Sequence, residues 1–137
     1  MVELRTGQAP PRLVEATGLE ELHAAELAVL RHVREHRDSV VLAAAASVVD
    51  VLTPEDLAGA WCVWLETDPG ALARRVSADH HERPLLGDRP AAVLADQHAR
   101  RSARGQQLAS FVIRTDDRSA ADVAAGICAA WREWARS

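Results

Sequence analysis

The sequence predicts an α/β protein in which helices flank a parallel sheet to give three layers. Three short apolar runs are each bounded by polar or turn residues, which is typical of fully buried strands. Segments with helical periodicity separate and follow these runs, and this alternation is the pattern of β-α-β crossovers. The predicted strands are Val40–Ala43, Cys62–Leu65 and Ser110–Thr115.

Recognisable signals mark several of the predicted helices. Residues 19–37 carry apolar residues on one face and charges on the other. Thr53 offers a capping hydroxyl and Pro54 suits the first helical position, so a helix is expected to start there. Ser119 and Asp122 form a capping-box pattern before an apolar stripe. Two further helices are predicted, one from Asp68-Pro69 to about Ala78 and one from Pro90 to about Arg104.

Length and composition predict a single soluble domain over residues 1–137. Hydrophobic residues make up 48% and charged residues 26% of the chain, which is ordinary for a globular domain. Neither a repeat nor a linker interrupts it. Aromatic residues are only 4% of the chain, so the core is expected to be thinly filled. Its bulky members are predicted to be Trp61, Trp64, Trp131 and Trp134.

Charge and cysteine content exclude several classes of partner. The net charge of −4 gives no support for binding nucleic acid. Cys62 and Cys128 lie in apolar surroundings and are predicted to be reduced core residues rather than a disulfide framework. The longest apolar run, residues 40–46, is too short to cross a membrane. With no apolar targeting stretch near Met1, the expected location is cytoplasmic.

The sequence lacks the residues that form a phosphate-binding loop. All 16 basic residues are arginine, so the sequence contains no lysine, and it contains no G-x-x-x-x-G-K-[ST] motif. Such a loop binds phosphates through backbone N–H groups and its lysine, and its hydroxyl holds Mg²⁺. Residues 1–137 alone are therefore predicted not to transfer a phosphoryl group by that route.

Arginines gather around a polar segment at about residues 79–89, which is predicted to be a mobile lid loop. Arg83-Pro84-Leu85-Leu86 lies within it, Arg75 precedes it, and the next helix carries Arg101. Guanidinium groups bind phosphate and carboxylate bidentately. Two interpretations stay open: the arginines converge on a small anionic ligand, or they are solvated surface residues.

Two histidine clusters invite a metal interpretation that the sequence does not favour. His32, Glu35 and His36 match an H-x-x-E-H pattern, but they lie near a helix end among other charges, which favours a solvated polar face. His80 and His81 are adjacent in a loop, and adjacent residues rarely bind one metal ion. No metal site is predicted.

Several segments occur in the same order, and at similar spacing, as in one enzyme family. Over nearly its whole length the chain resembles shikimate kinase, a P-loop small-molecule kinase of the nucleoside-monophosphate-kinase type. Arg101 falls on the arginine of that family's R-x-P-L-Y segment. The other matching segments are Arg5-Thr6-Gly7, Gly18–Glu26, Leu65-Glu66-Thr67, Arg83–Leu86 and Ile113–Asp117.

The resemblance implies an activity and a set of roles. Shikimate kinases are transferases of aromatic amino acid biosynthesis that use ATP and Mg²⁺ to phosphorylate the 3-hydroxyl of shikimate. Arg83 would be the catalytic lid arginine over the ATP phosphates, and Arg75 and Arg118 would border the adenine. Arg101 would pair with the shikimate carboxylate, and Glu26 would support the substrate arginine.

Departures from the family pattern affect the substrate side. The substrate arginine is replaced by His23, which cannot bind a carboxylate through two parallel hydrogen bonds. The family's T-G-G-G turn is replaced by Ala44-Ala45-Ala46-Ser47. If those positions need positive φ, each alanine costs on the order of 1 kcal/mol, so the turn is expected to be rebuilt. Shikimate is then a poor substrate, and a related cyclitol or other small alcohol is the alternative.

The resemblance also implies that a central part of the sheet has no counterpart in residues 1–137. The family's first strand, phosphate loop, first helix and second strand are unmatched, and the first strand would lie between Val40–Ala43 and Cys62–Leu65. Leaving that slot empty would cost on the order of 10 kcal/mol, while whole domains are stable by about 5–15 kcal/mol. Three outcomes are expected: the true start lies upstream, the strands close into a three-stranded sheet, or another chain or copy supplies a strand.

These observations predict a shikimate-kinase-like protein that is catalytically degenerate but retains nucleotide or anion binding. One alternative is an ATP-dependent kinase for shikimate or a related cyclitol, if the true N-terminus lies upstream. A further alternative is a non-catalytic interaction module that self-associates or binds a partner chain through an open sheet edge.

Overall fold

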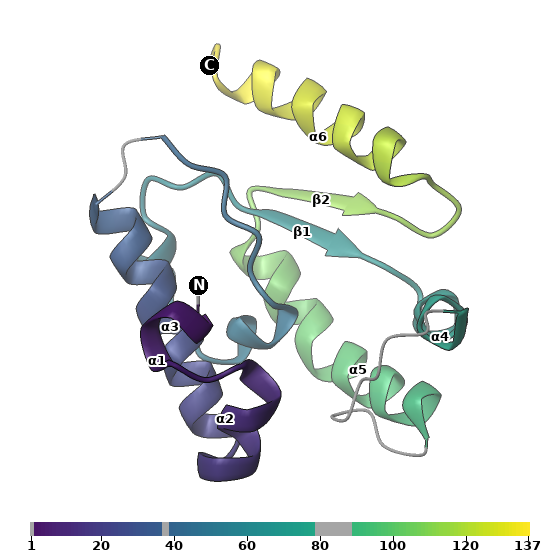
Figure 1. The fold of residues 1–137 in the computed structure, drawn as a ribbon. Helices are drawn as coiled ribbons and strands as arrows, with labels where there is room; N and C mark the ends of the chain where they lie inside the picture. The colour runs from purple at the N-terminus through teal and green to yellow at the C-terminus, as the bar shows by residue number, and fades with distance from the viewer. Residues whose placement is uncertain (1, 37–38, 79–88) are drawn as a thin grey trace. The chain divides into compact units, whose positions relative to one another are not determined.

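A computed structural model describes residues 2–36, 39–78 and 89–137 (Figure 1). The chain divides into two compact units, Met1–Asp56 and Leu57–Ser137. Among the described residues, no helix combines the length and the apolar character needed to cross a membrane.

The first unit is helical. Leu13, Leu22 and Ala25 form its buried cluster, and two valines pack against them. Gly7 and Gly18 separate the helices and adopt left-handed φ values of 72° and 93°, which glycine tolerates better than other residues. The three helices are α1 (Val2–Thr6), α2 (Pro10–Thr17) and α3 (Leu19–His36).

The predicted strand at Val40–Ala43 is wrong, because this segment is neither helix nor strand. Val41 is 99% exposed. A strand is stabilised by hydrogen bonds to a neighbouring strand, and the described part of the chain places none beside this segment. The chain continues into a short 3₁₀ helix, η1 (Ala46–Asp50), whose buried Val48 and Val49 follow Ser47.

The helix start predicted at Thr53 is a single capped turn. Asp56 Oδ2 accepts hydrogen bonds from Thr53 N at 2.9 Å and from Thr53 Oγ1 at 3.1 Å. The 3₁₀ helix that follows, η2 (Glu55–Leu57), has only three residues. Gly59 then adopts φ 75°, a conformation that ends a helix.

The second unit is a three-layer α/β arrangement, as predicted. Its sheet pairs β1 (Val63–Glu66) with β2 (Phe111–Arg114) in parallel, with Val63 opposite Phe111. In place of three strands, the described residues form two. Helix α5 packs on β1 and α6 on β2, from opposite sides (Figure 1). The helices are α4 (Pro69–Ala78), α5 (Pro90–Leu108) and α6 (Ala120–Trp134).

Tryptophans fill part of this unit, as expected, but two of the four do not lie in the core. Trp61 stacks on Phe111 with ring centroids 5.9 Å apart and lies 6.2 Å from Trp134. Trp131 and Trp134 are 50% and 49% exposed. The stripe on α6 is wide, and its edge extends beyond the strand that it covers. Cys128, predicted to be a core residue, is likewise exposed on this helix.

The capping box predicted at Ser119 is present and gives a testable contribution to stability. Its hydroxyl accepts a hydrogen bond from Asp122 N at 3.1 Å and donates to Asp122 Oδ2 at 2.6 Å, and this bond lowers the pKa of Asp122. Ser119→Ala should lower the free energy of unfolding by about 1 kcal/mol in urea titrations. Ser119→Thr keeps a hydroxyl that can accept from Asp122 N and donate to the Asp122 carboxylate, so it should lower the free energy of unfolding far less. Equal losses in the two variants would contradict the cap.

Candidate functional site

Polar side chains meet at the edge of the sheet where both strands end. Thr67 follows β1 and Thr115 follows β2, and their Oγ1 atoms lie 2.6 Å apart. Because the carboxyl ends of parallel strands share one edge, ligands of open α/β sheets bind there. This edge is the candidate site of the second unit.

Arg75 of α4 organises this edge. Its guanidinium donates to Thr115 Oγ1 at 3.1 Å and to the carbonyl oxygens of Thr115 and Asp116. The Asp116 carboxylate in turn accepts a hydrogen bond from Asp68 N at 2.6 Å. The loop after β2 is thereby fixed to the segment after β1, and Arg75 acts on it through backbone acceptors.

Of the other two arginines predicted for nucleotide binding, Arg118 lies within the described residues. Arg118 lies two residues after Asp116 in the loop that Arg75 holds, and its Nη2 donates weakly to Asp122 O at 3.5 Å. Arg83, with the rest of the predicted lid, lies outside the described residues. The sheet edge therefore brings Arg75 and Arg118 to one loop.

Four of the residues predicted for substrate binding lie in the first unit: His23, Glu26, Ala45 and Ala46. Ser47 Oγ donates to Glu26 Oε2 at 2.9 Å, which joins α3 to η1. His23 lies one helical turn before Glu26 and is half-buried. Ala45 has φ −64° and ψ 143°, and no described residue other than glycine has a positive φ. The turn through Ala46 is thus formed without left-handed alanines.

Arg101 lies on α5 in the second unit. Two residues near it on this helix donate hydrogen bonds to Glu66, a contact that the sequence did not suggest. Glu66, at the end of β1, accepts hydrogen bonds from Ser102 Oγ at 2.6 Å and from Gln106 Nε2 at 2.8 and 2.9 Å. The carboxylate therefore joins β1 to α5. Sequence reasoning did not assign site roles to Glu66, Thr67 or Thr115, although a threonine directly after each strand was a usable signal.

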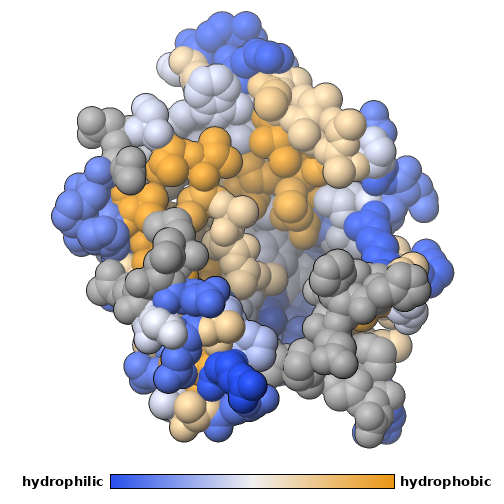
Figure 2. All heavy atoms as spheres, in the orientation of Figure 1, coloured by the Kyte–Doolittle hydropathy of each residue, from blue (hydrophilic) through white to orange (hydrophobic). Residues whose placement is uncertain are grey.

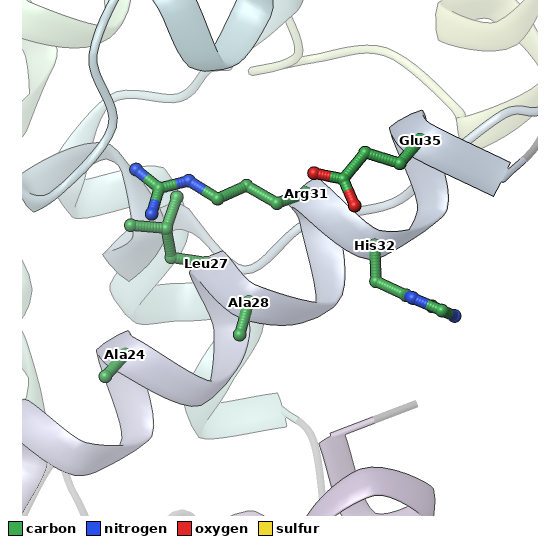
Figure 3. Close-up of a pocket in the computed structure, with 6 residues that line it drawn as sticks. All are labelled: Ala24, Leu27, Ala28, Arg31, His32 and Glu35. Atoms are coloured by element: carbon green, nitrogen blue, oxygen red, sulfur yellow. The ribbon is translucent and has the colours of Figure 1, made fainter.

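A shallow depression of about 370 Å³ lies along one face of α3 (Figure 3). In this view Arg31 extends back over Leu27, and the His32 side chain projects in a different direction from the same helix. None of the residues predicted for substrate binding lines it, and Arg31 is paired with Asp56 at 2.6 Å. The lining residues are Ala24, Leu27, Ala28, Arg31, His32 and Glu35.

The two histidines of the H-x-x-E-H pattern contact each other within α3. The rings of His32 and His36 lie 4.3 Å apart, and His36 Nδ1 is within 2.9 Å of the carbonyl of His32. Within residues 2–36, 39–78 and 89–137, no group of three or more histidine, cysteine or acidic side chains has the arrangement to hold a metal ion.

A parallel sheet flanked by helices, with a polar cluster at its carboxyl edge, places the chain among the open-sheet α/β proteins, whose ligand sites lie at that edge. Residues 1–132 match the sequence model of the shikimate kinase family. The chain is 28% identical over 122 residues to shikimate kinase of Rhodococcus erythropolis, covering 89% of this chain and 72% of the relative. The crystal structure of Bacteroides thetaiotaomicron shikimate kinase superposes with a TM-score of 0.70 at 18% identity, covering 84% of this chain and 68% of the other. The chain belongs to the shikimate kinase family, and its fold is that of these P-loop kinases.

Proposed function

We propose that this chain is a shikimate-kinase-family domain that binds a nucleotide or a similar phosphate-bearing anion at the carboxyl edge of β1 and β2, and that residues 1–137 alone do not catalyse turnover. The observation that carries this proposal is the loop after β2, which Arg75 fixes through Thr115 and Asp116. A loop held at two carbonyl oxygens is pre-organised, which reduces the entropy lost on binding.

The fit of these residues to ATP and Mg²⁺, which the family uses, is partial. Arg75 and Arg118 suit the base end of a nucleotide, because a guanidinium plane stacks on aromatic rings while its edge hydrogen-bonds. The phosphate end lacks a lysine in the sequence, and the described residues offer no three-ligand metal group. The edge would hold the base and ribose, and phosphoryl transfer needs groups that these residues do not supply.

A second candidate function, phosphorylation of a small alcohol together with a phosphate loop from additional polypeptide, is favoured by the contact between Ser47 and Glu26. This contact supports the proposal because it joins α3 to the segment that replaces the family's T-G-G-G turn. His23 at the position of the family's arginine favours a cyclitol over the carboxylate of shikimate, because the two ring nitrogens of histidine diverge and cannot bind a carboxylate bidentately.

Titration calorimetry with ADP, ATP and shikimate tests the proposal. We expect heat with the nucleotides and none with shikimate. Arg118→Ala should weaken nucleotide binding about tenfold, the size expected for one hydrogen bond to a charged group. The control Arg132→Ala changes an exposed arginine on α6 and should have no effect. A folded sample that binds neither nucleotide would refute nucleotide binding.

A further inference from the structure

Helix α6 is apolar on nearly all of its sides. Its residues Ala120–Trp131 include one charged side chain, Asp122, and the capping box binds that carboxylate. Val123 is buried and Ile127 is half-buried, so these two mark the side of the helix that packs on β2. A helix that is apolar all round normally lies in the interior of a protein, but most residues of this helix are exposed.

The exposed residues of α6 form a continuous face, which we call the outer face. It is defined by four exposed residues that project within about 60° of one another at 3.6 residues per turn: Ala121, Ala125, Cys128 and Arg132. Val123 projects in roughly the opposite direction, so the outer face points away from the sheet. Figure 2 shows pale orange residues along the middle of α6. Polypeptide that extended the sheet beside β1 would leave this face exposed.

Two residues that the sequence predicts for a core are exposed on or beside the outer face. Cys128 lies on it, and Trp131, which is 50% exposed, projects beside it. Exposed apolar patches with a polar rim mark interaction sites, and tryptophan is enriched in the centre of protein interfaces. A contact between proteins that buries both residues would reconcile their apolar character with their exposure.

The two ends of α6 carry charges of opposite sign. Three aspartates and one arginine lie at residues 116–122, whereas two arginines and one glutamate lie at residues 132–136. Two copies that pack antiparallel through their outer faces bring Arg132 of one copy beside Ala121 and Asp122 of the other, so opposite charges meet at both ends. Parallel packing would bring like charges together. Because a two-fold axis pairs a surface with itself, α6 is complementary to a second copy of α6.

We propose that α6 is a dimerisation surface, through which two copies of this chain pack antiparallel about a two-fold axis between Ala125 and Cys128. The alanines of the outer face let the two helix axes approach to about 8 Å. Ala125 of one copy then faces Cys128 of the other. A contact of one helix per copy is small for a specific interface, so we expect a dissociation constant on the order of 10–100 µM.

Sedimentation velocity over a concentration range of about 1–500 µM tests the proposal. The sedimentation coefficient should rise from that of a monomer to that of a dimer. Ala125→Glu places a carboxylate from each copy in the contact and should weaken dimerisation at least about tenfold. Circular dichroism should stay native, because Ala125 is exposed and glutamate is a good helix former. The control Ala103→Glu makes the same change at an exposed alanine of α5 and should dimerise normally.

Cysteine cross-linking locates the contact. Cys128 is exposed, whereas Cys62 is half-buried and its burial raises the pKa of its thiol, so a short bis-maleimide should join two copies through Cys128. Cys128→Ser should lose the cross-link and keep the sedimenting dimer, and Ala125→Glu should lose both. A chain that stays monomeric over the whole concentration range, a dimer that survives Ala125→Glu, or a dimer that is not joined through Cys128 would overturn the proposal. These measurements contain no nucleotide, so their outcome is independent of the function proposed above.

Discussion

Replacing Gly105 with valine should prevent stable folding of the second unit, and replacing it with alanine should destabilise that unit measurably. Gly105 is buried in α5, and a Cβ at this position would lie 2.5–2.6 Å from three ring atoms of Trp64. Real carbon atoms do not approach so closely, and overpacking a core costs about 1–3 kcal/mol or more. Alanine recovers up to about 1 kcal/mol of helix propensity, whereas valine recovers less and adds two methyl groups.

Urea unfolding followed by tryptophan fluorescence measures this effect, because all four tryptophans lie in residues 57–137. Gly126→Ala is the matched control. Its new Cβ would lie 2.9 Å from Ile113 Cδ1 and 3.5 and 3.9 Å from the Arg118 guanidinium nitrogens. These atoms are the ends of side chains that can shift, so the helix-propensity gain should leave stability equal or higher. The double variant Gly105→Ala with Trp64→Leu should lose less than the sum of the single changes. A neutral Gly105→Ala would show that α5 does not rest on Trp64.

Local signals in the sequence predicted the second unit well. Both of its strands and the Ser119 capping box depend on neighbouring residues, and all are present. Val40–Ala43 has the composition of a buried strand, but a strand also needs a partner, which a local pattern does not encode. The capping signal at Thr53 was also correct. The helix that follows it, however, ends after three residues, before Gly59.

The candidate site was predictable where it follows chain order and unpredictable where it depends on packing. Thr67 and Thr115 each follow a strand, so parallel topology alone would bring them to one edge. The contact between Ser47 and Glu26 joins positions 21 residues apart, and no local pattern indicates it. Arg75 was predicted to border a nucleotide, and its contacts with two carbonyl oxygens depend on where the fold places α4 relative to the loop after β2.

Asp56→Asn should make the free energy of unfolding of the first unit less dependent on pH in the acidic range. Arg31 Nε donates to Asp56 Oδ1 at 2.6 Å, and Thr53 adds further hydrogen bonds. These contacts, chiefly the one with Arg31, lower the pKa of Asp56 from 3.8 to about 2. The unfolded chain therefore binds the proton more tightly, so this stabilisation is complete above about pH 5 and is lost as the pH falls toward 2. Because Arg31 is half exposed, we expect a contribution of about 1–2 kcal/mol.

The measurement is thermal unfolding by far-ultraviolet circular dichroism between pH 7 and pH 2, since the first unit has no tryptophan. The difference in stability between the parent and Asp56→Asn should be largest at neutral pH and should shrink through the acidic window. Asp96→Asn is the matched control: its carboxylate lies 2.7 Å from Arg100, but both side chains are about two-thirds exposed. Its loss should stay within about 0.5 kcal/mol. Equal losses would mean that distance alone, and not the burial of Asp56, sets the strength of the pair.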